Sequence, residues 1–323
     1  MMRILFITST RIGDAVLSTG VLNHLIKTHP NAKFTIACGP VAAPLFEATP
    51  QVERVHVMTK KKRSMHWIEL WKECGLTWWH RVIDLRNGPI TYLFPTLRGC
   101  HLHHDDKTLH RVELFSNLLK LEQPQGPTLW TNATHEKAAD QLLPAGEPIL
   151  AVGPTANWRG KTWRAEYFLE LVTRMTAQDG FLPGAKIALF GHISEREPAQ
   201  GLIDNLPNDQ KIDLIGDLDL PTVYACLKRC TFYVGNDSGL MHMACAAQIP
   251  TLGLFGPTQE KLYAPWGEHC ATVRTKTPFL DLFGENFDHQ KTDSLMDSLS
   301  VDMAYVGAQS LWTKVQQSEK TTP

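Results

Sequence analysis

The chain has 323 residues, of which 43% are hydrophobic and 20% charged, a composition typical of a soluble globular protein with two domains. Its 32 Lys and Arg residues nearly balance 33 Asp and Glu residues, and the net charge of −1 argues against a dedicated nucleic-acid-binding protein. No apolar stretch approaches the roughly 20 residues of a membrane-spanning helix, and the N-terminus predicts a buried strand rather than a signal peptide. Seven scattered cysteines predict free thiols in a reducing cytoplasm.

The first part of the chain alternates between short apolar runs and segments with helical spacing. Its pattern predicts strands at 3–8, 33–39, 52–58 and 80–87, and helices at 15–30, 43–50, 60–75 and 108–122. Since strands and helices alternate, we expect a parallel sheet with helices on both faces.

The same alternation restarts after two Pro- and Gly-rich stretches at 122–130 and 142–149. It predicts strands at 147–155, 185–191, 211–216, 231–236 and 249–256, helices at 164–178, 197–206, 220–230 and 239–248, and a final amphipathic helix at 294–315. We therefore expect an α/β protein with two Rossmann-like, doubly wound parallel-sheet domains facing a cleft. The predicted domains span residues 1–145 and 146–295, and residues 296–323 form the last helix and a frayed tail.

Ligands of doubly wound domains bind at the carboxyl ends of the strands. Polar residues at these positions are therefore candidates for a site. In the first domain they are Ser9, Thr10, Arg11, Gly13, Asp14, Arg86 and Asn87, and in the second Thr155, Asn157, Arg159, Lys161, 191–195, 236–242 and 256–258.

The stretch GNDSGLMH, residues 235–242, is a strand–turn–helix junction. Asp237 or Ser238 is expected to cap the helix, and Gly239 lets a ligand approach the backbone. Free N–H groups and the helix dipole favour an anion there, and His242 lies one turn further on. A capped helix with a histidine in the core explains the same residues. The polar FGPT segment at the end of the next strand favours the anion site.

Two further residues have both a chemical and a structural interpretation. Lys161, in the loop NWRGKTW, is placed to neutralise a diphosphate, as are Arg159 and Arg164, although a loop lysine is usually solvated. Asp14, at the first strand–helix turn, is either a general base or an ordinary helix cap.

The basic run KKKR at 60–63 is either a solvated surface or a site for an acceptor that carries carboxylates or phosphates. Trp67 and Trp71 follow one helical turn apart, and core packing is their simpler role. A basic run beside exposed tryptophans also suits peripheral contact with a membrane surface.

The combination of these motifs resembles glycosyltransferase family 9, the heptosyltransferases of lipopolysaccharide core synthesis. The matching segments are MRILFITSTRIGDAVLS, KTW, GNDSGLMHMACA and LFGPT followed by APWG, and the resemblance extends from Met2 to about Trp312. It implies the two-domain GT-B fold, with an N-terminal acceptor domain, a C-terminal nucleotide-sugar domain and a last helix that crosses back to the first domain. It also implies an inverting transfer that needs no metal and no cofactor, with ADP-heptose as the usual donor.

Carried over by position, the resemblance implies that Asp14 is the catalytic base and that Lys161 holds the donor diphosphate. Ala156 and Asn157 replace threonines of some members, which leaves the identity of the donor open. The implied donor-binding residues are Asn157, Lys161, Glu195, Leu218, Asp237, Ser238, Gly239, His242 and Thr258, and the acceptor-binding residues are Arg11, Lys60, Lys61, Lys62 and Arg63.

The sequence therefore predicts an inverting glycosyltransferase that moves heptose from ADP-heptose to a glycolipid, an inner-core lipopolysaccharide acceptor. Its predicted location is the cytoplasm, with peripheral contact to the inner membrane. Three alternatives remain open at this point: a relative that uses another nucleotide sugar or acceptor, a nucleotide-sugar epimerase on the same fold, and a non-catalytic binding module.

Overall fold

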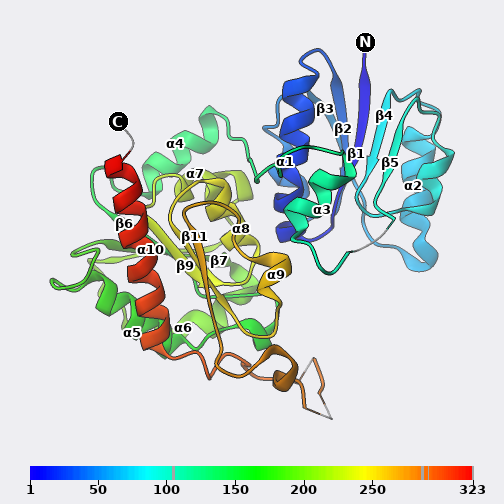
Figure 1. Ribbon diagram of the computed structural model, residues 1–323. Helices are drawn as coiled ribbons and strands as arrows, with labels where there is room; N and C mark the ends of the chain where they lie inside the picture. The colour runs from blue at the N-terminus through cyan, green and yellow to red at the C-terminus, as the bar shows by residue number, and fades with distance from the viewer. Residues whose placement is uncertain (104–105, 285–286, 290, 322–323) are drawn as a thin grey trace. The chain divides into compact units, whose positions relative to one another are not determined.

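The computed structural model describes residues 1–103, 106–284, 287–289 and 291–321 (Figure 1). The chain divides into two compact units, Met1–Asn132 and Ala133–Pro323. Each unit contains one parallel sheet with helices on both faces, so the predicted α/β class and the two doubly wound domains are confirmed.

The first unit is built on a five-stranded sheet of order β3-β2-β1-β4-β5 in which every neighbouring pair is parallel. Its strands are β1 (Arg3–Ile7), β2 (Lys33–Cys38), β3 (Val52–Val57), β4 (Arg81–Asp84) and β5 (Gly99–His101). Its α-helices are α1 (Ile12–Thr28), α2 (Met65–Cys74) and α3 (Arg111–Leu118), and short 3₁₀ turns lie at Ala43–Phe46, Lys62–Ser64 and Pro89–Leu93.

The two faces of this sheet are covered by different helices because side chains alternate along each strand. Leu5 and Ile7 of β1 share a buried cluster with Trp67 and Leu70 of α2. Ile4, fully buried, points to the opposite face, where α1 and α3 pack together. The alternation of hydrophobic side chains thus fixes the doubly wound arrangement.

The second unit is built on a six-stranded parallel sheet of order β11-β10-β9-β6-β7-β8. Its strands are β6 (Ile149–Gly153), β7 (Lys186–His192), β8 (Lys211–Gly216), β9 (Phe232–Asn236), β10 (Thr251–Phe255) and β11 (Cys270–Arg274). Its α-helices are α4 (Ala133–Leu142), α5 (Ala165–Thr176), α6 (Arg196–Asn205), α7 (Leu220–Leu227), α8 (Gly239–Ala246), α9 (Glu260–Tyr263) and α10 (Val301–Thr321), with 3₁₀ turns at Arg159–Lys161, Ile193–Glu195 and Phe279–Leu282.

One large core joins this sheet to α5, α6 and α10. Val152 of β6 and Val234 of β9 lie in it with Phe168 of α5 and Ala304 of α10, all of them buried. Helices α7 and α8 pack against each other, and α8 contacts β9 and β10.

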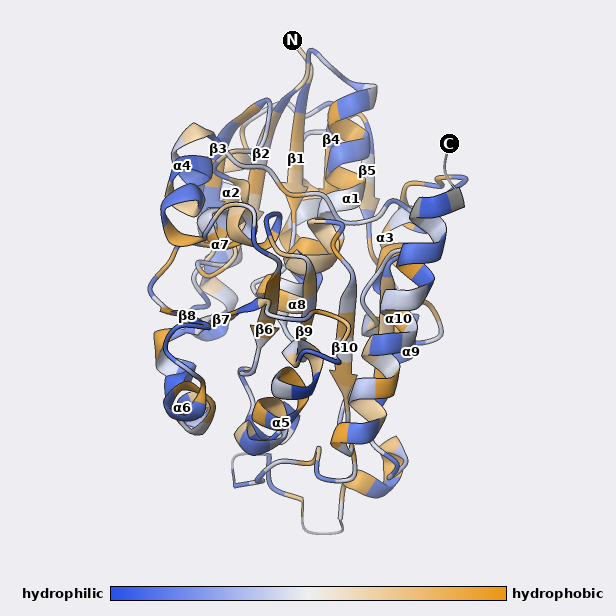
Figure 2. Cartoon of the chain, turned by 90° about the vertical axis from the view of Figure 1, so that its left-hand side faces the viewer, coloured by the Kyte–Doolittle hydropathy of each residue, from blue (hydrophilic) through white to orange (hydrophobic). Residues whose placement is uncertain are grey.

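Figure 2 shows that the hydropathy of each element agrees with its burial: β1 and β10 are mainly hydrophobic, whereas α10 carries hydrophobic and hydrophilic residues on different faces.

The boundary between the units falls one helix earlier than the predicted boundary after residue 145. Helix α4 packs against α7 of the second unit. Ion pairs hold it there, since Arg229 lies 2.8 Å from Glu136 and 2.6 Å from Asp140, and Lys228 also pairs with Glu136. Only Ala139 of this helix is buried, so its hydrophobic periodicity is too weak to place it from the sequence.

Several other elements differ from their predicted bounds. The sequence pattern does not predict β5, β11 or α9, because they are short and β5 and β11 contain no buried residue. Helix α10 begins at Val301 rather than at 294, because the preceding segment is hydrogen-bonded to the end of the loop between β6 and α5. Ser294 Oγ donates a hydrogen bond to the Thr162 carbonyl (2.7 Å), and Trp163 Nε1 donates one to the Leu299 carbonyl (2.9 Å).

Helix α10 packs against α5, β10 and β11 of its own unit. Its predicted crossing to the first unit stays a prediction. No helix within the described ranges is long and apolar enough to cross a membrane. All seven cysteines lie among the described residues and are free thiols, as predicted, and burial raises the pKa of Cys226 to about 11.

Candidate functional site

The strand order of the second unit reverses between β6 and β9, which lie side by side in the sheet. The chain runs from β6 through β7 and β8 on one side and returns to β9 on the other. Ligands of open α/β sheets bind at the carboxyl ends of the strands at such a switch point. The loop with Lys161 follows β6, and the turn with Asp237 follows β9.

Lys161 and Asp237 form an ion pair at this switch point, with 2.6 Å between Nζ and Oδ2. The side chain of Asp237 is 7% exposed and that of Lys161 24%, so the carboxylate is nearly buried while the ammonium still reaches solvent. A lysine carries three N–H donors, and one carboxylate contact does not exhaust them. The pair therefore fixes the position of the Lys161 ammonium at the switch point.

Asn236 anchors the loop that carries Lys161. Its fully buried amide accepts a hydrogen bond from the Trp163 N–H (3.0 Å) and donates one to the Pro154 carbonyl (2.9 Å). The end of β9 is thus tied to both ends of the loop after β6. Asn236 fell inside the polar segment noted in the sequence, but its anchoring role depends on contacts with residues more than 70 positions away.

Ser238 is the N-cap residue of α8, as the sequence predicted, but the expected side-chain cap is not formed. Ser238 occupies the N-cap position with an extended backbone, and its side chain makes no cap hydrogen bond. The Asp237 carboxylate is instead turned to Lys161. The N-terminus of α8 therefore lacks a side-chain cap, which leaves its N–H groups and dipole available to an anion.

Buried polar groups surround this helix N-terminus. His242 is 2% exposed, on the first turns of α8, and Thr258 Oγ1, in the loop after β10, is buried without a hydrogen-bond partner among the described residues. Tyr233 is fully buried, and burial raises the pKa of its hydroxyl. Its hydroxyl lies where a Cβ at Gly153 or Gly235 would stand, so the two glycines make room for the ring.

The remaining residues predicted to bind the nucleotide-sugar donor lie along the same edge of the sheet, but they differ in their burial and contacts. Glu195, after β7, accepts a 2.8 Å hydrogen bond from Thr155 Oγ1, after β6. Leu218 is half-buried in the turn before α7, whose N-cap is Asp219. Asn157 is exposed. Glu195 is thus tied to the loop after β6, through a threonine that was not among the donor residues implied by the resemblance.

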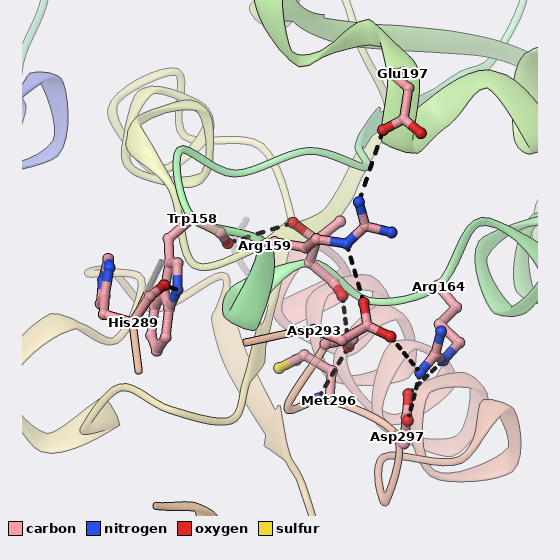
Figure 3. A network of polar contacts seen from close by, with 10 residues as sticks. Trp158, Arg159, Arg164, Glu197, His289, Asp293, Met296 and Asp297 are labelled. Atoms are coloured by element: carbon pink, nitrogen blue, oxygen red, sulfur yellow. Dashed lines mark hydrogen bonds and ion pairs between the residues drawn. The ribbon is translucent and has the colours of Figure 1, made fainter. Parts of the chain in front are cut away.

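Arg159 and Arg164 are turned to a different part of the chain (Figure 3). Arg159 contacts Asp293 at 3.0 Å and Glu197 at 3.9 Å. Arg164 makes a two-pronged contact with Asp297, at 2.6 and 2.7 Å, and these carboxylates raise its pKa. Their charges are thus already neutralised, so the expectation that they neutralise a diphosphate beside Lys161 is not supported.

In the first unit, the strand order reverses between β1 and β4, and Asp14 lies just after β1. Asp14 stands in the first turn of α1, half-buried, and its Oδ2 lies 3.5 Å from Ser9 Oγ. Ser9 Oγ also accepts a hydrogen bond from the backbone N–H of Arg11, whose side chain is exposed. The carboxylate is therefore held at the carboxyl end of the first strand.

The basic run at 60–63 is exposed between β3 and α2. Lys61 pairs with Glu69 of α2, so its charge is largely neutralised. Arg63 and Ser64 adopt positive φ angles of 53° and 57°, a conformation that is uncommon for residues other than glycine. No group of three or more His, Cys, Asp or Glu side chains lies close enough, among the residues described, to hold a metal ion.

The sequence model of glycosyltransferase family 9 (heptosyltransferase) matches residues 102–286, more than half of the chain. The chain belongs to glycosyltransferase family 9. A lipooligosaccharide heptosyltransferase 2 of Campylobacter jejuni is 24% identical over 296 residues, which cover 84% of this chain and 87% of that relative. A lipooligosaccharide heptosyltransferase 2 of Haemophilus influenzae is 29% identical over a shorter stretch of 146 residues, or 41% of its length.

The solved structure of the E. coli ADP-heptose lps heptosyltransferase II superimposes with a TM-score of 0.73 at 19% identity, covering 98% of this family 9 chain and all of the E. coli chain. At this identity the likeness bears on the fold alone. It agrees with the two parallel-sheet units described above and assigns them to the GT-B fold, as the sequence predicted.

Proposed function

We propose that this chain is an inverting, metal-independent glycosyltransferase that transfers heptose from ADP-heptose to an inner-core lipopolysaccharide acceptor. The observation that carries the proposal is the Lys161–Asp237 pair beside the uncapped N-terminus of α8, at the switch point of the second unit. A lysine and a free helix N-terminus are together suited to a diphosphate. Membership of a family of heptosyltransferases, two of whose relatives act on lipooligosaccharide by name, supports the sugar and the acceptor.

The donor is proposed to bind along the carboxyl edge of the second sheet. Lys161, His242 and the α8 N-terminus at Ser238 and Gly239 stabilise the leaving diphosphate, which needs charge stabilisation rather than a proton. Asp237 holds Lys161 in place. Thr258 adds a hydroxyl near the phosphates, and Asn157, Glu195 and Leu218 line the nucleoside side.

Asp14 is proposed to be the base that takes the proton of the acceptor hydroxyl. An inverting transfer needs one such carboxylate on the side of the sugar opposite the leaving group. Its place after β1 and its support by Ser9 fit this role. Arg11 and the basic run at 60–63 are proposed to meet the acceptor, and peripheral contact of the first unit with the cytoplasmic face of a membrane belongs to the same proposal.

The test compares donor binding and transfer in three variants. Lys161→Gln removes a charge-assisted contact of about 1.5–3 kcal/mol, so we expect calorimetric titration with ADP-heptose to show a roughly 10- to 100-fold weaker Kd. Lys186→Gln is the matched control, since Lys186 stands at the opposite end of the same sheet, at the start of β7. Asp14→Asn should keep donor affinity and lose transfer.

Three results would overturn parts of this proposal. Full transfer by Asp14→Asn removes the base assignment. Equal donor affinity in Lys161→Gln and Lys186→Gln removes the diphosphate assignment. Conversion of the donor to an epimerised nucleotide sugar, without any acceptor, replaces transfer by epimerisation.

A further inference from the structure

Arg86 lies at the switch point of the first unit. It follows β4 by two residues, and β4 pairs with β1 so that Asp84 stands opposite Ile7. The order of the sheet reverses between these two strands. Arg86 therefore occupies the position at which open α/β sheets bind ligands, next to the strand that precedes Asp14.

The guanidinium of Arg86 is half-buried and has no carboxylate partner among the described residues. It lies 5.0 Å above the ring centre of Trp67, and its Nη1 is 3.7 Å from Met58 Sδ, a weak acceptor. Burial lowers the pKa of Arg86, which reports the cost of removing this cation from water. The charge of Asp84 offsets part of this shift, but no ion pair to the guanidinium is present among the described residues, so a ligand of opposite sign would compensate the desolvated cation.

Asp84, whose charge acts on Arg86, already accepts hydrogen bonds from other donors. It is fully buried and accepts hydrogen bonds from the backbone N–H of Arg86 at 2.8 Å, that of Gly88 at 2.7 Å and the Thr91 hydroxyl at 2.7 Å. These contacts fix the loop after β4. Because these donors occupy the Asp84 carboxylate, the side chain of Arg86 lies against Trp67 and Met58 instead.

His66, the residue before Trp67, supplies a second donor without an acceptor. It is 5% exposed, and burial and then the charge of Arg86 lower its pKa, which favours the neutral imidazole. Its Nδ1 accepts a long hydrogen bond from the backbone N–H of Lys61 (3.5 Å), an arrangement that favours the tautomer with the ring proton on Nε2. Nε2 is buried and has no hydrogen-bond partner among the described residues.

The Trp67 ring under the Arg86 guanidinium is tightly packed. A Cβ at Gly88 would stand 2.3 Å from the Trp67 ring, so the ring packs directly on the backbone after β4. Trp67 itself is 9% exposed and belongs to the core under α2. The guanidinium plane is therefore held by buried groups, unlike the exposed Lys60, Lys62 and Arg63.

We propose that Arg86, supported by Trp67 and His66, is an anion subsite that binds a carboxylate or phosphate group of the sugar acceptor. An arginine fork binds either group through two parallel N–H donors. The proposal rests on the proposed function for its ligand, since it assigns the acceptor side of that reaction. In this proposal Arg86 is a specificity residue, because it favours acceptors that carry an acidic group.

The first experiment measures anion binding without donor or transfer. Thermal unfolding of wild type, Arg86→Gln and Arg98→Gln is followed while sodium glucuronate or glucose 6-phosphate is added. Arg98 is an exposed arginine of the same unit and serves as the control. We expect at least one anion to raise the Tm of wild type and Arg98→Gln, and Arg86→Gln to lose most of that shift. Equal shifts in all three proteins would overturn the proposal.

The second experiment uses transfer to identify the group. Arg86→Gln should raise the acceptor KM by roughly 10- to 100-fold, leave the donor KM within about twofold, and be partly rescued by Arg86→Lys. The acceptor is also supplied with its carboxyl groups reduced or its phosphates removed. Removing the group that Arg86 binds should raise the wild-type KM to that of Arg86→Gln and leave the variant unchanged.

The outcomes separate this proposal from the proposed function. Anion binding that depends on Arg86, in a protein without transfer activity, would keep the subsite and remove the transferase assignment. Transfer with an unchanged acceptor KM in Arg86→Gln, or a penalty that persists on an acceptor without acidic groups, would remove the subsite and keep the transferase.

Discussion

Asn236 joins the two loops that form the switch point of the second unit, so its replacement by alanine is the most direct test of the fold around that site. The substitution leaves the Trp163 N–H and the Pro154 carbonyl buried without their partner, since both hydrogen bonds end on the Asn236 amide. An unsatisfied buried polar group costs about 1–3 kcal/mol. With two such groups, Asn236→Ala should lower the free energy of unfolding of this unit by about 2–6 kcal/mol, or roughly 4–24 °C in Tm.

Two measurements check this expectation. Calorimetry gives the change in Tm, and hydrogen exchange at the Trp163 amide reports the lost bond directly, because this N–H donates to Asn236 Oδ1. Asn205→Ala is the control, as Asn205 donates one exposed hydrogen bond, to the Gly201 carbonyl at 2.8 Å. Donor affinity should also fall, because Lys161 belongs to the loop that Asn236 anchors.

Similar stabilities of Asn236→Ala and Asn205→Ala would refute the reasoning. So would unchanged exchange at the Trp163 amide, since the anchor would then not depend on the asparagine. A loss of stability with full donor affinity would show that the Lys161 loop keeps its place without Asn236.

Three further predictions follow from other features of the chain. Gly235→Ala should destabilise the second unit by about 1–3 kcal/mol in urea unfolding, because the new Cβ would stand 2.4 Å from the Tyr233 hydroxyl, whereas Gly216→Ala meets no atom within 4 Å and should be near neutral. Burial lowers the pKa of His66, so the folded chain binds fewer protons than the unfolded chain below about pH 6.5. Stability should therefore fall as the pH drops through that value and level off below the folded pKa, and His66→Gln should show a flatter pH profile. Arg164→Ala should cost no more than about 1 kcal/mol and less in 1 M NaCl, since its partner carboxylates are half-exposed; a large loss that persists in high salt would contradict this estimate.

The sequence alone was sufficient for the fold class and for the edges of the sheets at which to look for a site. Apolar runs with period two and helical segments alternate along the chain, and this alternation is a local property that a single sequence displays. It placed Asp14 after β1 and Lys161 after β6, where the structure has them. It did not place α4, which docks through ion pairs and buries one alanine.

Local sequence could not decide which charged side chains remain available at the site. Lys161, Arg159 and Arg164 belong to one loop and are equivalent by residue type. The structure pairs Arg159 and Arg164 with carboxylates of 293–297 (Figure 3). It pairs Lys161 with Asp237 after β9. These partners are 76 to 134 positions away along the chain.

The same limit applies to Asn236 and Arg86. Both follow a buried strand, and their residue types predict an ordinary turn as well as a site. Their roles depend on what stands opposite: the two ends of the loop after β6 for Asn236, and for Arg86 the Trp67 ring, with no carboxylate paired to the guanidinium among the described residues. Periodicity along the chain determined the strands and helices. The order in which the strands assemble decided the switch points and which charges are paired there, because that order brings distant side chains within bonding distance.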